Sequence, residues 1–123
     1  MSTLRVNTIQ PVSGTPSITS SEIATLSRIM LGNSSQTWTN VTASRAFGTT
    51  YTNSTGAPIM VVVAFAYPGA GAAGNFTVGG VLITFGQVNA AYIQLASGTA
   101  IVPAGATYVF ATNTTIHQWL ELR

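Results

Sequence analysis

Short runs of strand-forming residues, separated by turn-forming residues, fill the chain from residue 33 to residue 123. Thr, Val, Ile, Tyr and Phe dominate the runs, and Gly, Asn, Pro and Ser separate them. A series of about seven to nine short strands at regular spacing is typical of a sandwich or a jelly roll. We therefore expect an all-β domain over residues 33–123, with the fold of a jelly-roll-like β-sandwich.

The longest apolar run, Ile59 to Tyr67, contains three consecutive valines and is predicted to be a strand. A second strand is expected to start at Phe76 and Val78, to be interrupted at Gly79-Gly80 and to continue through Val81 to Phe85. The turn-forming residues predict turns at Asn53–Gly56 and at Pro103–Gly105. Further strands are predicted around the remaining apolar groups: Trp38, Val41 and Phe47; Tyr92, Ile93 and Leu95; Ile101 and Val102; Tyr108 and Phe110.

The last predicted strand is Ile116 to Leu122. Successive side chains on a strand point to opposite sides. We therefore expect one face to carry Ile116, Gln118, Leu120 and Leu122, and the other His117, Trp119, Glu121 and Arg123.

Residues 1–32 form a second predicted unit, an N-terminal attachment arm followed by a short helix. Residues 1–19 are polar and contain the breakers Pro11, Gly14 and Pro16. Such a segment holds too little apolar surface to fold alone. We expect it to be extended and to become ordered by docking on a partner.

The helix signal begins at Thr19, which together with Glu22 has the spacing of a capping box. Gly32 stands where a glycine would end the helix. Ile23, Leu26 and Met30 are three and four residues apart, the spacing of a coiled-coil seam. The helix can pack on its own β domain or on copies of itself, and we expect self-association into a trimer.

The chain has four Arg or Lys and two Asp or Glu residues among 123. A compact monomer of 12.7 kDa would expose roughly one charge per ~1,000 Å². Soluble surfaces are far richer in charge, with about 25–35% charged residues. Part of this surface is therefore expected to face another copy or a partner.

We expect no membrane insertion, because the most apolar stretch is interrupted by Pro and Gly and is shorter than a spanning helix.

Groups that carry catalysis are scarce, since the chain has one His, two acidic residues and no Cys. Most enzymes need a general base, an activated nucleophile or a metal. The segment Gly69–Gly74 matches a dinucleotide-binding spacing, but no helix pattern follows it, so we interpret it as a surface loop. We expect a protein that is not an enzyme, with no cofactor, no metal site and no nucleic-acid partner.

Four stretches of the chain, Ser2–Gln10, Arg45–Ile59, Val102–Tyr108 and Ile116–Leu122, resemble structural proteins of tailed-bacteriophage virions. The opening Ser2 to Gln10 is similar to the start of many tail-fibre proteins. The stretches Arg45 to Ile59 and Val102 to Tyr108, with the ending Ile116 to Leu122, are similar to fibre-tip domains. Together these motifs resemble a short tail-fibre or receptor-binding protein.

The resemblance implies a homotrimer located in the virion, with an N-terminal attachment segment and a C-terminal β domain that faces outward. The arm would dock on another virion structural protein through its apolar residues Leu4, Val6, Ile9 and Val12. The β domain would attach to a host surface glycan or protein, and the candidate receptor contacts are Tyr67, Gly69, Ala70, Gly71 and Asn75. A fibre shaft is missing, which leaves open the alternative of a capsid decoration (cement) protein that binds the phage shell.

Overall fold

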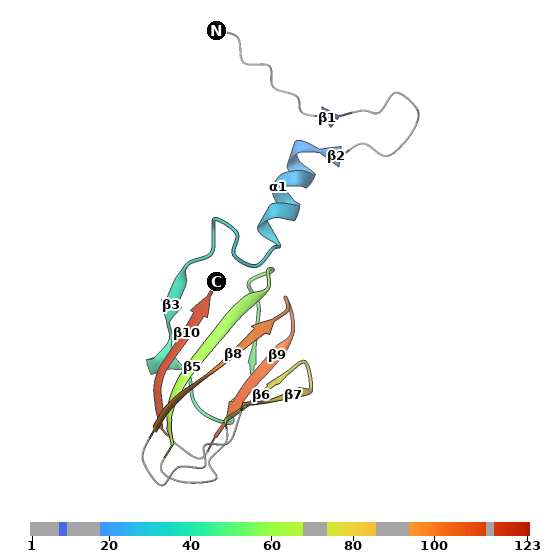
Figure 1. The fold of residues 1–123 in the computed structure, drawn as a ribbon. Coiled ribbons are helices and arrows are strands. Elements are labelled where there is room, and N and C mark those ends of the chain that lie inside the picture. Colours follow the sequence, from blue (N-terminus) through green and yellow to red (C-terminus); the bar gives the residue numbers. More distant parts are fainter. Residues whose placement is uncertain (1–7, 10–17, 68–73, 86–93, 113–114) are drawn as a thin grey trace.

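The computed structural model describes residues 8–9, 18–67, 74–85, 94–112 and 115–123. Two four-stranded antiparallel sheets pack into a sandwich, and a short helix stands off one end of it (Figure 1). The expected all-β sandwich is therefore confirmed.

The strand order of each sheet is nested with respect to the sequence. The first sheet has the order β3 (Trp38–Asn40), β10 (Ile116–Leu122), β5 (Ile59–Tyr67), β8 (Gln94–Val102). The second has the order β4 (Tyr51–Thr52), β9 (Thr107–Ala111), β6 (Gly74–Val78), β7 (Val81–Phe85). The antiparallel pairs β3/β10, β4/β9, β5/β8 and β6/β7 are what one long folded ribbon of strands produces.

The core lies between the sheets and is mostly aromatic and β-branched. Alternate residues of β5 are buried, from Ile59 to Phe65. The ring of Phe110 lies with its centroid 5.0 Å from that of Phe65 and 4.8 Å from that of Phe76. Trp119 of β10 is fully buried beside them. Each such side chain stabilises the fold by about 1.5–3 kcal/mol through burial of apolar surface.

The two predicted turns are confirmed. Gly56 and Gly105 have positive φ values of 78° and 75°, and the Ala106 N–H donates to the Pro103 carbonyl at 3.1 Å. The buried Asn53 side chain links the turns, because its Nδ2 donates to the carbonyl oxygens of Ala57 at 2.7 Å and Val102 at 3.0 Å.

The prediction of one strand interrupted at Gly79-Gly80 was wrong. The chain reverses there, and Val78 pairs with Val81 across a two-residue hairpin between β6 and β7. Both glycines have positive φ, 56° and 84°. This conformation is the one that matches the twist of a tight hairpin, and only glycine adopts it twice in succession without strain.

Other strand boundaries also differ from the expectation. β3 ends at Asn40, and Val41 leads into a 3₁₀ helix, η1 (Thr42–Ser44), so Phe47 is not in a strand. β8 runs without interruption to Val102, which joins Leu95 and Ile101 in one strand; Tyr92 and Ile93 lie outside the described residues. On β10 the pairing shifts between Ile116 and Gln118. This irregularity turns Ile116 toward the core, away from the face shared by Gln118, Leu120 and Leu122.

The helix α1 (Ser20–Arg28) begins as predicted but ends early. Thr19 is the N-cap, and both hydrogen bonds of the capping box with Glu22 are present. The C-cap is Ile29, so the expectation that Gly32 ends the helix was wrong. The Asn33 side chain donates to the Met30 carbonyl at 2.8 Å, which holds the backbone in a turn where another helical turn would have formed.

The N-terminal arm is described only at two short strands that precede the helix. β1 (Thr8–Ile9) pairs antiparallel with β2 (Ile18–Thr19), and Ile9 is opposite Ile18. The arm thus pairs with itself at this point, where the sequence predicted only an extended segment.

Candidate functional site

Four apolar side chains at the helix end form an exposed group, which we name the helix surface. It consists of Ile23 and Leu26 of α1 with Ile29 and Met30 just after it, and these residues are 47–64% exposed. The helix stands clear of the sandwich (Figure 1), so its apolar residues are not buried on the β domain. In the structure, therefore, the helix does not pack on its own β domain, which was one of the two alternatives expected from the sequence.

The predicted helix seam included three of these four residues. Ile29 was missed because the helix was expected to continue to Gly32, which would have turned position 29 away from the seam. Since the helix ends at Arg28, Ile29 occupies the C-cap and Met30 lies in the bend that follows. The four side chains nevertheless remain solvent-exposed in the single chain.

The remaining predicted contacts are only partly described. Of the arm residues, Ile9 lies in β1, and Leu4, Val6 and Val12 lie outside the described residues. Of the receptor candidates, Tyr67 ends β5, and Asn75 is half-buried in β6, opposite Thr84 and Ala111. Gly69, Ala70 and Gly71 lie outside the described residues.

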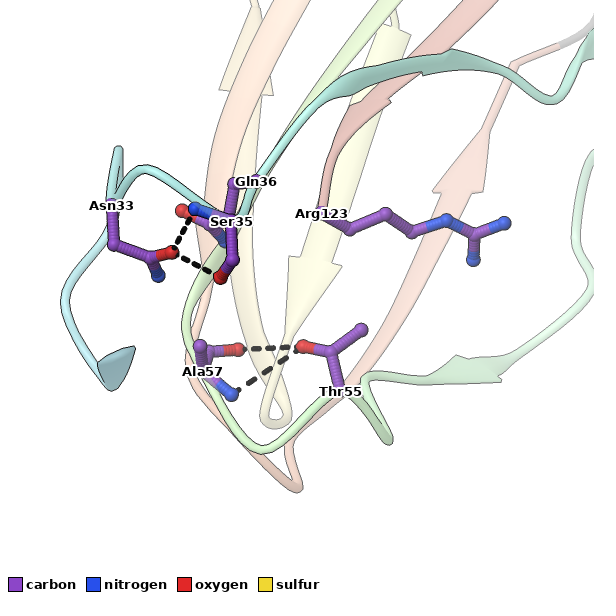
Figure 2. A pocket seen from close by; sticks show the side chains of 6 residues that line it. All are labelled: Asn33, Ser35, Gln36, Thr55, Ala57 and Arg123. Atoms are coloured by element: carbon purple, nitrogen blue, oxygen red, sulfur yellow. Dashed lines mark hydrogen bonds between the residues drawn. The ribbon is translucent and has the colours of Figure 1, made fainter. Parts of the chain in front are cut away.

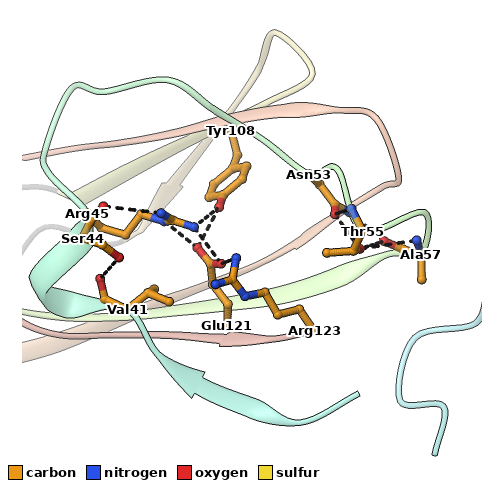
Figure 3. A network of polar contacts seen from close by, with 9 residues as sticks. All are labelled: Val41, Ser44, Arg45, Asn53, Thr55, Ala57, Tyr108, Glu121 and Arg123. Atoms are coloured by element: carbon orange, nitrogen blue, oxygen red, sulfur yellow. Dashed lines mark hydrogen bonds and ion pairs between the residues drawn. The ribbon is translucent and has the colours of Figure 1, made fainter. Parts of the chain in front are cut away.

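A buried ionic cluster that the sequence did not predict lies inside the sandwich (Figure 3). The carboxylate of Glu121 is fully buried, and its Oε1 accepts hydrogen bonds from Arg45 Nε at 2.8 Å and from the Tyr108 hydroxyl at 2.7 Å. Its Oε2 accepts a hydrogen bond from Arg45 Nη2 at 3.0 Å and lies 3.2 Å from Arg123 Nη1. The Arg45 guanidinium also lies 4.4 Å from the ring centroid of Tyr51. The cluster joins three parts of the chain: Arg45 follows directly after Ser44, Tyr108 lies in β9, and Glu121 and Arg123 are two residues apart.

The cluster shifts the pKa values of its members. Burial raises the pKa of Tyr108 to about 12, and the hydrogen bond to Glu121 adds to the effect. Burial alone would raise the pKa of Glu121, but hydrogen bonds from Arg45 and Tyr108 and the charges of both arginines outweigh it and lower that pKa. Glu121 is thus held as a carboxylate and Tyr108 as a neutral phenol.

This cluster contains every formally charged side chain between residues 33 and 123. Glu121 is fully buried, the Arg45 side chain is 14% exposed, and only Arg123, at 37%, reaches the solvent substantially. The outside of the sandwich is therefore almost without charge. Glu121 has no open side for a ligand, because both of its oxygens are already in contact with protein donors.

Two tyrosines of the sandwich, Tyr51 and Tyr108, have structural roles. Tyr108 is 2% exposed and belongs to the ionic cluster. Tyr51 packs edge-on against Trp119, and its hydroxyl accepts a hydrogen bond from the Ala46 N–H at 2.9 Å. Neither ring presents a stacking surface to a saccharide.

A small polar pocket of about 350 Å³ lies where the linker after α1 meets the β4–β5 turn (Figure 2). It is lined by Asn33, Ser35, Gln36, Thr55, Ala57 and Arg123. Several of these groups bond to protein: Gln36 Nε2 donates to the Pro58 carbonyl at 2.8 Å, and Thr55 Oγ1 donates to Asn53 Oδ1 at 2.7 Å. The pocket residues Thr55 and Ala57 lie just before the start of β5, whereas the receptor candidate Tyr67 lies at its other end.

Within the described part of the chain, no group of three or more His, Cys, Asp or Glu side chains is placed to hold a metal ion. Nor does any described helix have the length and apolar character needed to cross a membrane. No protein-family model matches the chain, and no curated protein or solved structure is similar enough to count as a match.

Proposed function

We propose that this chain is a non-enzymatic structural protein of a tailed-phage virion. In this proposal it is a homotrimeric short tail fibre or tail-tip protein that attaches to the host surface. The observation that carries the proposal is the helix surface, which is apolar, exposed and separated from the sandwich. The sequence resemblance to fibre proteins supplies the virion context.

The helix surface is difficult to explain in a monomer. An isolated helix of fewer than about 12 residues is marginal in water, and α1 has nine. Its apolar side chains would bury one another if three copies of the helix met along one axis. Association would therefore stabilise both the helix and the subunit contact.

The positions of the helix and of the receptor candidates at opposite ends of the sandwich agree with attachment at one end and recognition at the other. The helix leaves the end where β5 begins and β10 finishes. The opposite end holds Tyr67, Gly74, Phe85 and Gln94, which are strand ends paired two by two. The predicted receptor contacts Tyr67 and Asn75 belong to this far end. If the arm docks on the particle, that end is the one that points away from it.

The nested strand pairing supports a jelly roll as the finer description of the fold. Winding one long antiparallel ribbon into two sheets pairs its first strand with its last and its second with the one before the last. The pairs β3/β10, β4/β9, β5/β8 and β6/β7 follow this rule. Such a domain closes most of its edges while it leaves loops clustered at its ends.

Immunogold labelling of particles tests the location. We expect gold at the end of the tail. Label spread over the whole capsid surface would contradict the tail assignment and support a decoration protein.

Adsorption tests the attachment role. Particles whose protein lacks residues 70–73 are expected to bind host cells poorly, while the purified variant keeps the oligomeric state of the wild type. Unchanged adsorption would remove the loop from the proposed receptor site. Cleavage of a host glycan by the purified protein would contradict the non-enzymatic assignment.

A further inference from the structure

The outer faces of the two sheets differ sharply in character. On the β3-β10-β5-β8 sheet, strand pairing places Trp38, Leu122, Met60 and Ile101 in one row across all four strands. Trp38 and Ile101 are 52% and 54% exposed, and the two between them are half-buried. Leu120 and Val62 extend this apolar group in the next row. We name these six residues the apolar row group.

The outer face of the β4-β9-β6-β7 sheet is mostly polar. Strand pairing places five polar residues on this face, Thr52, Thr107, Asn75, Thr77 and Thr84, together with three apolar ones, Val109, Ala111 and Leu82. Water solvates a threonine-rich face readily, whereas it does not favour a row of four large apolar side chains. One sandwich therefore has one face suited to solvent and one suited to contact.

The row of four large apolar residues on the first sheet lies toward the helix, while Leu95, opposite Ala66 at the other end of the same face, is a further apolar residue, 67% exposed. The row of Trp38 lies at the end where the chain enters from α1 (Figure 1). Moving away from α1, the next rows contain Asn40 and Thr99, and then Gln118 and Ser97. The apolar row group and the helix surface thus belong to the same end of the molecule.

Neither surface is large enough alone for a stable contact. Four strands about 4.8 Å apart and about seven residues long cover roughly 450 Å² per subunit. A nine-residue helix, about 14 Å long and 10 Å wide, adds roughly 140 Å². Specific interfaces bury about 600–1,000 Å² per partner, and only the two surfaces together come close to the lower end of that range.

A second copy of this chain is the occupant that matches both surfaces at once. It carries its own helix surface and its own apolar row group, and neither contains a charged residue. A partner with ordinary surface charge would have to desolvate that charge without compensation against this face. We infer that the β3-β10-β5-β8 sheet packs its outer face against neighbouring copies, around the same axis as the helices, and that the β4-β9-β6-β7 sheet faces solvent. This inference rests on the proposed trimer.

Sedimentation velocity of three full-length chains tests this: wild type, Ile101→Arg and Leu82→Arg. Both substitutions replace an exposed apolar residue, 54% and 63% exposed, on the outer face of a different sheet. We expect Ile101→Arg to weaken association by tenfold or more and Leu82→Arg to leave it unchanged. Equal association of all three, or dissociation by Leu82→Arg alone, would overturn the inference.

A second measurement does not depend on how arginine is tolerated. The chain has no cysteine, so Ile101→Cys and Leu82→Cys each introduce one thiol. In the assembled protein, a maleimide reagent should modify Ile101→Cys at least tenfold more slowly than Leu82→Cys. If both variants form a trimer like that of the wild type and are modified at equal rates, the assignment of the β3-β10-β5-β8 sheet to the interface is wrong, but the proposed trimer is not contradicted. A monomeric wild type would instead overturn the proposed function itself.

Discussion

Arg45 Nε lies 2.8 Å from Oε1 of Glu121, and the carboxylate that it contacts is completely buried. The two residues are 76 positions apart in the sequence, with Arg45 directly after η1 and Glu121 in β10. Their pairing removes two charged side chains from the surface of a chain that has only six. The exterior is consequently even poorer in charge than the composition indicates.

Replacing Glu121 with Gln should destabilise the sandwich by about 3 kcal/mol, because it leaves two guanidinium groups beside a buried neutral amide. Urea unfolding measures this loss. Glu22→Gln is the matched control, since it removes the same charge from an exposed capping position and keeps a residue that can complete the capping box. A loss for Glu121→Gln no larger than for the control would show that the buried pair does not stabilise the fold.

Alkaline pH should weaken the fold through Tyr108. Its pKa is about 12 in the folded chain, above the ordinary tyrosine value of 10.0. Between these pH values the unfolded chain loses this proton while the folded chain keeps it, so the free energy of unfolding falls as pH rises. The loss is at most about 3 kcal/mol.

Tyr108→Phe isolates that contribution. At neutral pH this variant should be less stable by about 1.5–3 kcal/mol, because it loses a hydrogen bond to a charged acceptor. The difference from wild type should then narrow between pH 10 and pH 12. A constant difference over this range would contradict the assigned shift in the Tyr108 pKa.

Asn53→Ala should destabilise the sandwich by about 2–3 kcal/mol. The buried amide donates to the Ala57 and Val102 carbonyls, and its Oδ1 accepts from Thr55 Oγ1 at 2.7 Å. Removing it takes a donor from the Ala57 and Val102 carbonyls and an acceptor from the Thr55 N–H. The neighbouring exposed Ser54 supplies the control, and Ser54→Ala should change the free energy of unfolding by less than about 0.5 kcal/mol.

The sequence predicted those parts of the fold that depend on local chemistry. The run Ile59–Tyr67, the turn at Asn53 and the capping box of Thr19 and Glu22 were all correct, because each signal lies within a few residues. The Gly79-Gly80 hairpin was also local. It was missed because apolar residues on both sides resembled one continuous strand, although a glycine pair is a known two-residue turn signal.

The features that were missed depend on residues far apart in the chain. Nothing near Glu121 indicates Arg45 as its partner, since their meeting depends on how the sheets stack. One signal was available, because Glu121 and Trp119 are two residues apart and so share one face of the strand. If Trp119 is in the core, Glu121 is also buried, and a buried carboxylate requires a cationic partner. The irregularity at Ile116 has no comparable signal, because it inserts one residue into an otherwise regular alternation.

The mass of the intact chain in solution tests the central claim most directly. Sedimentation equilibrium from micromolar concentrations upward should give a species of about three times 12.7 kDa, which becomes smaller when Ile23 and Leu26 of the helix surface are both replaced by Gln. A single compact species of 12.7 kDa at every concentration would contradict the assembly on which the proposed attachment role depends.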